Sequence, residues 1–114
     1  MILFYDRAGN PLTVEQWSAF IERQDPEYKR VAETTVDDVW ISTVWLGINY
    51  AFNPDHPPLI FETMVFGGPY DQEWMERYST MAQADQGHRE MVDRVIAYKG
   101  VHAEVEELFK NLEV

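Results

Sequence analysis

Two side chains, His88 and Glu62, have the types and settings that acid–base chemistry needs. His88 lies on the apolar side of a helical pattern and follows Gly87. A glycine inside a helix costs about 1 kcal/mol relative to alanine, which indicates that another group approaches the backbone closely there. Glu62 interrupts the apolar run 59–66. A histidine within reach of a carboxylate can act as a general base, as in a small hydrolase-type enzyme, or hold a ligand. The alternative, which we favour, is a structural hydrogen bond from a half-buried imidazole that fixes helix to strand.

The segment Arg77-Tyr78-Ser79-Thr80 precedes the start of that helical pattern. Exposed amides at a helix N-terminus bind anions, and Arg77 can add a bidentate contact to a phosphate or carboxylate. Gly67-Gly68 would let a nucleotide-like ligand approach the backbone. A simpler explanation is that Thr80 and Gln83 form a capping box while Arg77 pairs with a neighbouring acid. The candidate ligand-binding residues are Glu62, Arg77, Tyr78, Ser79, Thr80 and His88.

We predict no metal site, no cofactor and no catalytic residue set. The chain has no cysteine, which excludes thiolate zinc sites and thiol nucleophiles. Its histidines, His56, His88 and His102, belong to different predicted elements, whereas histidine metal sites usually contain two ligands one helical turn apart. The sequence also contains no phosphate-binding loop, glycine-rich dinucleotide turn or nucleophile-elbow pattern.

Acidic residues dominate the charge of the chain. Twenty acids against nine bases give a net charge of −11, which argues against direct binding to nucleic acid because phosphates would repel it. The segment 31–76 contains eight acids and neither lysine nor arginine. Two interpretations remain open. Arg77, Arg89 and Arg94 could neutralise this segment in three dimensions, or its acids could form a negative field that steers a basic partner or a cation.

Aromatic residues are numerous for so short a chain, with four Trp, six Tyr and six Phe. A small domain cannot bury all of them, and exposed Trp and Tyr side chains are typical anchors of protein interfaces. We therefore expect a homo-oligomer or a complex with another protein. The candidate interaction surface consists of Asp37, Asp38, Trp45, Asp55, Asp71, Glu73 and Trp74.

Hydrophobic periodicity predicts a single α+β domain, 1–114: an antiparallel sheet of about four strands with two or three helices packed on it. The segment 39–50 gives the strongest strand signal. Because apolar residues fall on both of its alternating faces, we expect protein to cover both. Thr13 and Thr80 are expected to cap helices, and Gly100 to end one as its C′ residue. The expected strands span 1–5, 28–35, 39–50 and 59–66, and the expected helices span 14–23, about 80–99 and 101–112.

The sequence predicts neither membrane insertion nor export. No apolar run approaches the roughly 20 residues that a membrane-spanning helix needs. The first residues, MILFYDRAGNP, have no basic segment ahead of the apolar one, as a signal peptide would. We therefore expect a cytoplasmic protein.

Four segments together resemble a known group of proteins: 42–47 (STVWLG), 57–68 (PPLIFETMVFGG), 77–80 (RYST) and 87–88 (GH). The chain is similar over roughly residues 40–96 to small proteins of tailed-bacteriophage and prophage genomes, especially those of actinobacteria. In that group an Asp-His pair often follows the Leu-Gly, where this chain has Asn49-Tyr50. The resemblance implies a phage or prophage origin, a host-cytoplasm location and an accessory role, and it carries no known activity.

Three hypotheses of function follow. The first is a phage-encoded, non-enzymatic accessory protein whose acidic, aromatic surface binds a host or phage protein with a basic surface, such as a nucleic-acid-binding or defence protein, and inhibits or modulates it. The second is a protein that binds or sequesters a nucleotide-like ligand at Arg77 and the helix N-terminus near Thr80. The third, and least favoured, is an enzyme that uses His88 and Glu62.

Overall fold

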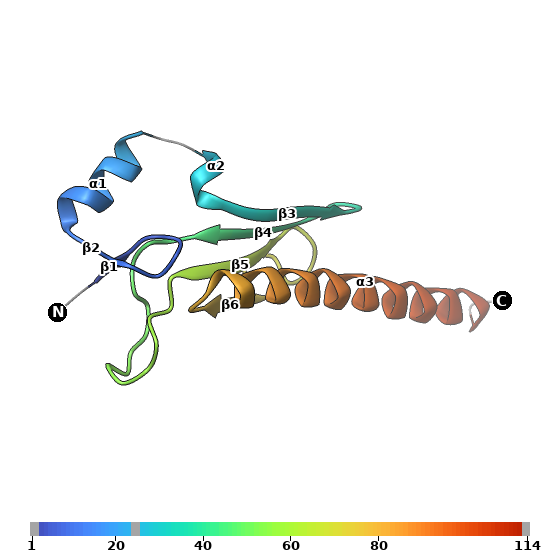
Figure 1. Cartoon of the computed structure of the whole chain (residues 1–114). Coiled ribbons are helices and arrows are strands. Elements are labelled where there is room, and N and C mark those ends of the chain that lie inside the picture. Colours follow the sequence, from blue (N-terminus) through green and yellow to red (C-terminus); the bar gives the residue numbers. More distant parts are fainter. Residues whose placement is uncertain (1–2, 24–25, 113–114) are drawn as a thin grey trace.

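The computed structural model, which describes residues 3–23 and 26–112, contains a four-stranded antiparallel sheet. Its strands follow one another in the order β3-β4-β5-β6, so each strand pairs with the next one in the chain (Figure 1). Helices and a two-stranded sheet accompany it, and this arrangement confirms the predicted α+β class. The strands are β3 (Arg30–Val36), β4 (Val39–Trp45), β5 (Phe61–Phe66) and β6 (Met75–Tyr78).

One face of the sheet is buried and the other is open. Alternate residues of β4 and β5 are buried, whereas the residues between them are more accessible, and Trp40 is 40% exposed. On the open face the rings of Trp40 and Phe66 lie 5.1 Å apart. Within the described part of this chain the expected cover is therefore present on one face of β4 only, and cover of the other face by a second protein stays a prediction. Apolar residues on this face, among them Trp40, Val44 and Phe66, make it less polar than an ordinary solvated sheet face.

The predicted strand 39–50 ends at Trp45 because the backbone turns at Gly47, which has a φ of 76°. A side chain at Gly47 would also collide with the ring of Trp45, 2.6 Å from the position of a Cβ atom. Beyond this turn an isolated bridge joins Phe4 to Ile48, and the Tyr50 amide donates to the Leu59 carbonyl at 3.0 Å. The chain then passes through the loop that leads to β5.

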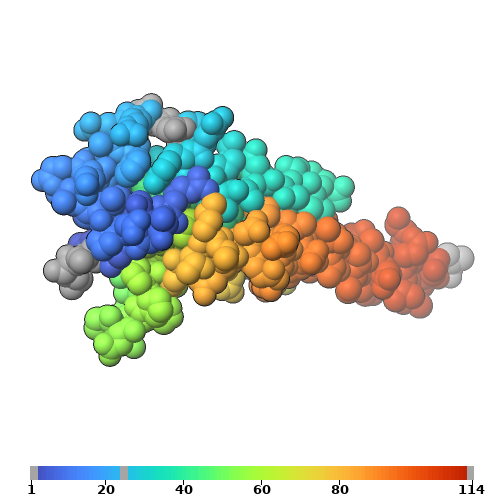
Figure 2. Space-filling model, in the orientation of Figure 1, coloured from blue at the N-terminus to red at the C-terminus, as the bar shows by residue number. Residues whose placement is uncertain are grey.

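The longest helix, α3 (Met81–Leu112), covers the buried face. Its 32 residues extend over about 48 Å at 1.5 Å per residue. The first part contacts all four strands of the sheet, whereas residues 100–112 are all exposed and project beyond the body (Figures 1 and 2). The prediction that Gly100 ends a helix is wrong. A C′ glycine needs a positive φ, and Gly100 does not have one, so the helical hydrogen bonding continues through it.

Two apolar clusters fill the space between sheet and helix. Val39, Ile41 and Val65 pack with Met91 and Val95, and Trp45, Ile60 and Phe61 pack with Ala84. The amino-terminal part of the chain, including Trp17, Phe20 and Tyr28, packs against the second cluster.

The amino-terminal part forms a small layer of its own. Strands β1 (Phe4–Tyr5) and β2 (Pro11–Leu12) pair with each other, so the predicted strand 1–5 does not join the main sheet; Met1 and Ile2 lie outside the described residues. Helix α1 (Val14–Glu22) begins at Thr13 with the predicted capping box. The short helix α2 (Pro26–Lys29) occupies the start of the predicted strand 28–35, and β6 replaces 1–5 as the fourth strand. Within the described part of the chain, no helix is long and apolar enough to cross a membrane.

Candidate functional site

The predicted pairing of His88 with Glu62 is wrong. Glu62 lies on the open face of the sheet, because its neighbours Phe61 and Thr63 point to the buried face. His88 lies on the buried face and is 5% exposed. Two threonines hold its ring: Nε2 is 2.8 Å from Thr34 Oγ1, and Nδ1 is 2.7 Å from Thr43 Oγ1. This is the structural hydrogen bond between helix and strand that the sequence also allowed.

The His88 imidazole is the centre of a buried polar chain that crosses the sheet. Thr43 Oγ1 lies 2.5 Å from Thr63 Oγ1, and the Thr63 hydroxyl partly offsets the effect of burial on the pKa of Tyr78. Burial lowers the pKa of His88, an effect that the nearby Asp85 carboxylate partly offsets. The neutral ring, with one donor and one acceptor nitrogen, suits two hydroxyls that can each donate or accept. Both ring nitrogens have hydroxyl partners and the side chain is 5% exposed, so the arrangement supports the fold.

Gly87 is required for the fit of α3 against β6. A Cβ atom at this position would lie 2.2 Å from the Tyr78 ring. The sequence-based expectation that some group approaches the backbone at Gly87 is confirmed, and the group is Tyr78. Burial raises the pKa of Tyr78, whose ring packs against the second apolar cluster.

Most of the remaining predicted ligand-binding residues have hydrogen-bond partners within the protein. Arg77 Nε donates to Glu62 Oε2 at 3.0 Å, and the guanidinium lies 4.4 Å from the centre of the Tyr50 ring. At the helix start, the Gln83 side chain accepts from the amides of Ser79 and Thr80 at 3.0 and 3.2 Å. The Gln83 amide donates to Thr80 Oγ1 at 3.1 Å. Capping therefore uses the amides of Ser79, Thr80 and Gln83, and Arg77, which would add a contact, is paired with Glu62. Arg77, Tyr78, Ser79 and Thr80 nevertheless line a common cavity of about 880 Å³.

The acidic segment 31–76 is partly neutralised. Lys99 Nζ lies 2.7 Å from Asp38 Oδ1 and 3.8 Å from Asp37 Oδ2. This hydrogen bond lowers the pKa of Asp38 and raises that of Lys99. Arg77 pairs with Glu62, and Arg30 pairs with Glu33 at 3.4 Å. Four of the eight acids thus have a cationic partner, and these pairings could not be predicted from the sequence. Arg89, which was expected to neutralise the segment, pairs with Asp85 on its own helix instead.

The predicted interaction surface divides into three places. Trp45 is 2% exposed, because it occupies a buried-face position of β4, so its assignment to a surface is wrong. Asp55 lies in the loop that follows the far end of β4, at the opposite end of the sheet from the β3–β4 turn (Figure 1). The other residues lie on the β3–β4 turn and the β5–β6 connection, at one end of the sheet: Asp37, Asp38, Asp71, Glu73 and Trp74.

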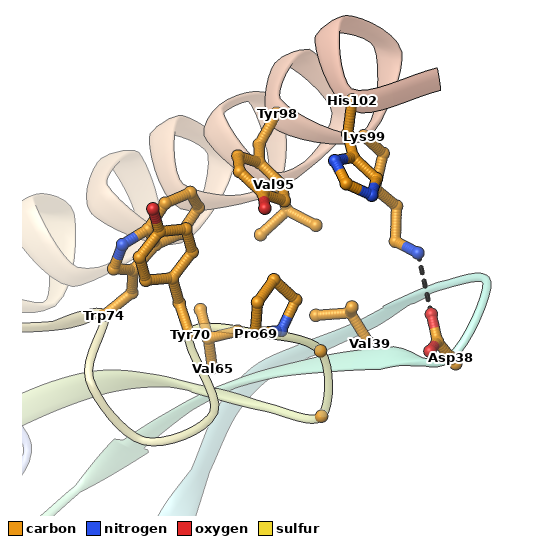
Figure 3. A pocket seen from close by; sticks show the side chains of 12 residues that line it. Asp38, Val39, Val65, Pro69, Tyr70, Trp74, Val95, Tyr98, Lys99 and His102 are labelled. Atoms are coloured by element: carbon orange, nitrogen blue, oxygen red, sulfur yellow. Dashed lines mark hydrogen bonds and ion pairs between the residues drawn. The ribbon is translucent and has the colours of Figure 1, made fainter. Parts of the chain in front are cut away.

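That end of the sheet contains a cavity of about 370 Å³, which we call the socket (Figure 3). Its walls come from the start of β4, the end of β5, the β5–β6 connection and α3. Tyr70 and Trp74 stack at 4.5 Å, and Tyr98 meets both edge-on at 5.2 and 5.7 Å. Residues of three kinds line the socket: aliphatic Val39, Val65, Pro69 and Val95, aromatic Tyr70, Trp74 and Tyr98, and polar Asp38, Lys99 and His102, with Gly67 and Gly68 in the backbone wall.

Two glycines shape the wall of the socket. Gly67 and Gly68 have φ values of 87° and 73°, in the left-handed region. A Cβ atom at Gly67 would lie 2.5 Å from the Asp38 carbonyl oxygen, and the Gly67 amide donates to Asp71 Oδ1 at 2.7 Å. The Gly-Gly pair therefore lets the two turns approach each other, which explains it without a nucleotide.

Sequence reasoning missed the part of the socket that α3 supplies. Tyr98, Lys99 and His102 continue the stripe of Met91 and Val95 at spacings of three and four residues. That spacing was visible, but the expected helix end at Gly100 separated His102 from the others. Arg94, whose guanidinium lies 4.0 Å from the centre of the Trp74 ring, was expected to pair with acids instead.

No site for a metal ion emerges from the described residues, in which no group of three or more His, Asp or Glu side chains gathers. Comparisons with protein-family models, with curated proteins and with solved structures give no match for this chain.

Proposed function

We propose that this protein is a non-enzymatic binding protein whose socket receives a large apolar side chain from a basic surface of another protein. The observation that supports this most is the socket itself, an apolar cavity of about 370 Å³ with a wall of three aromatic rings. Tyrosine and tryptophan are enriched among the residues that dominate binding energy, and such residues cluster in pockets that exclude water. A cavity with this lining therefore suits an anchor side chain.

The residues around the opening of the socket favour a partner that has a cationic residue next to its anchor side chain. Asp37, Asp38, Asp71 and Glu73 lie on the two turns that form this opening, and all four are exposed. The α3 side supplies Lys99, which already shares the first two carboxylates, and Arg94, which covers Trp74. Acids thus outnumber bases around an apolar centre. Lysine or arginine residues beside the anchor of the partner would meet carboxylates, which raises association rates and rejects acidic competitors.

The resemblance of residues 40–96 to phage and prophage proteins supports the setting of this proposal. In that setting the protein acts in the cytoplasm of the host cell as an accessory protein. Its partner is a host or phage protein with a basic surface, such as a nucleic-acid-binding or defence protein, which it inhibits or modulates by occupying that surface.

A random-peptide display library, panned against the purified protein, tests the chemistry of the socket and requires no identified partner. We expect enrichment of peptides with one large apolar residue flanked by lysine or arginine. Binding of a selected peptide, measured by fluorescence anisotropy, should weaken as salt screens the charges. Tyr98→Ala, which removes part of the aromatic wall, should raise the Kd about thirtyfold, the effect of losing a hot-spot residue of about 2 kcal/mol.

Glu73→Lys, which reverses a charge beside the socket, should weaken binding mainly at low salt. Asp55→Asn is the control for this charge change, because it removes an exposed acid at the other end of the sheet and should leave the Kd unchanged. Selection of peptides without this pattern, or a Kd that Tyr98→Ala does not change, would contradict the proposed function.

A further inference from the structure

The part of α3 beyond the sheet, residues 100–112, exposes a continuous apolar stripe. We call this part the α3 extension. Every one of its residues is exposed, and beyond His102, which lines the socket, it projects from the body (Figures 1 and 2). Its apolar side chains and their exposed fractions are Val101 60%, Val105 41%, Leu108 63%, Phe109 61% and Leu112 77%.

The spacing of the stripe is that of a coiled coil. From Tyr98 the residues Val101, Val105, Leu108 and Leu112 follow at intervals of three, four, three and four, which places them at alternating a and d positions. Phe109 occupies the adjacent e position. A helix of roughly 12–15 residues is marginal in water without packing, so a helix of this length that carries such a seam is expected to have a partner helix.

The geometry points to a second copy of this chain as that partner, with the two α3 extensions packed antiparallel about a two-fold axis. In such an interface each residue contacts a different residue of the other copy, and the relation is reciprocal. Antiparallel packing in the a-to-d register pairs Val101 with Leu112 of the second copy and Val105 with its Leu108. The seam is thereby filled by layers that each combine a short side chain with a longer one.

Three features favour the antiparallel over the parallel orientation. Glu104, at a g position, faces Asn111 of the second copy, whose amide can donate to the carboxylate; in a parallel pair it faces Phe109. Opposed helix dipoles attract each other. In the antiparallel pair the two sheet domains also lie at opposite ends of the helix pair and not side by side. This separation lowers the repulsion between two chains that each have a net charge of −11.

The size of the stripe sets the expected strength of the dimer. Full burial of a Val, Leu or Phe side chain removes roughly 60–120 Å² of apolar surface from water, so five partly exposed side chains per copy supply about 550 Å² in total. If polar atoms contribute the share that they have in an ordinary interface, the dimer buries about 900 Å² of surface in total. This is below the roughly 1,200–2,000 Å² that standard complexes bury. We therefore expect a concentration-dependent dimer in the micromolar range.

Analytical ultracentrifugation of the full chain over a wide concentration range tests the dimer. The wild-type protein should pass from monomer to dimer, and Leu108→Glu, in a central layer, should weaken association at least tenfold while circular dichroism shows an unchanged fold. Ile96→Glu is the matched control: Ile96 is also an exposed apolar residue of α3, but it lies off the stripe, so dimerisation should persist. A wild-type monomer at every concentration, or a dimer that Leu108→Glu leaves intact, would overturn the inference.

Disulfide trapping tests the orientation, and the absence of cysteine from the chain makes single labels unambiguous. We expect a mixture of the Val101→Cys and Leu112→Cys variants to form the mixed disulfide under mild oxidation. Each variant alone should form little, because its two copies of the label are about 16 Å apart along the antiparallel pair. Preferential disulfides within each single variant would instead establish a parallel pair and contradict the proposed arrangement.

Discussion

At the scale of single residues, the hydroxyls of Thr34, Thr43 and Thr63 and the imidazole of His88 tie the covering helix to strands β3, β4 and β5. Buried polar groups are costly unless every one of them is hydrogen-bonded. Here each hydroxyl finds a partner, so the chain of bonds fixes the position of α3 over the sheet. Apolar contacts alone would allow the helix to slide more easily.

The burial of His88 predicts a loss of stability in mild acid. The folded state holds the pKa of His88 below its usual value of 6.5, so above that pH both states are neutral and no penalty arises. As the pH falls below 6.5, the unfolded chain binds a proton that the folded chain resists, and the free energy of unfolding decreases until the pH passes the folded pKa. Urea unfolding at a series of pH values should show this decrease.

His88→Gln should lose most of that pH dependence, whereas His102→Gln, at an exposed position of the same helix, should retain it. A variant at His88 with the same pH dependence as the wild type would show that other groups cause the effect.

Thr43→Val tests the hydrogen bonds themselves. Valine has a similar shape but leaves His88 Nδ1 and Thr63 Oγ1 without the hydroxyl that joins them. We expect the free energy of unfolding to fall by about 1–3 kcal/mol, the cost of an unsatisfied buried polar group. Thr35→Val, on the exposed face of β3, should change it by less than about 0.5 kcal/mol. Equal effects of the two substitutions would contradict the role of the network.

At the scale of elements, two glycines of α3 have opposite roles. A Cβ at Gly87 would meet the Tyr78 ring, whereas a Cβ at Gly100 would meet no described atom within 4 Å beyond the nearby backbone of its own helix. Gly87→Ala should therefore destabilise the protein by about 1–3 kcal/mol through overpacking, although alanine is the better helix former. Gly100→Ala should stabilise it by up to about 1 kcal/mol. Thermal or urea unfolding measures both, and a stabilised Gly87→Ala variant would contradict the close packing of α3 against β6.

Periodicity predicted the elements that have a strong pattern and missed those that do not. The strands β4 and β5 were predicted because alternation over six or seven residues is a clear signal, and Thr13 and Thr80 revealed two helix starts. Strand β6 has only four residues, two of them charged, and it forms through pairing with β5, which sequence does not display.

The face of each strand was the other feature that the sequence left open. Glu62 and His88 were expected to meet, but a shift of one residue along a strand moves a side chain to the opposite face. In the same way, Trp45 was assigned to the surface from its type, whereas its register with Phe61 makes it core. The socket joins segments that are distant in the chain, so the sequence predicted some of its residues, Asp38 and Trp74, as surface residues but not the cavity that they form with α3.

At the scale of the whole molecule, the shape is elongated, with principal extents of 65 × 31 × 19 Å, because α3 continues beyond the sheet. The net charge of −11 is spread over this shape, and the ion pairs among the described residues neutralise part of it. Like charges repel most strongly when the chain is folded, so self-repulsion is expected to lower the stability of this protein.

Salt should therefore stabilise the fold. Raising the ionic strength from about 0.01 to about 0.15 M shortens the Debye length from about 30 to about 8 Å and screens the repulsion. We expect a higher Tm in a thermal unfolding experiment, and the same increase with sodium and with choline chloride, since screening does not depend on the cation. A Tm that falls as salt is added would show that the exposed ion pairs contribute more than the repulsion.

The order of the elements has a consequence for synthesis. All four strands of the sheet precede α3 in the chain, and α3 supplies the contacts that bury their apolar face. While a ribosome is still making the strands, that face has no cover, and stable tertiary structure must wait until the residues near Val95 have emerged from the exit tunnel. Nascent chains stalled before that point should remain sensitive to protease and bind chaperones, and those stalled well after it should not.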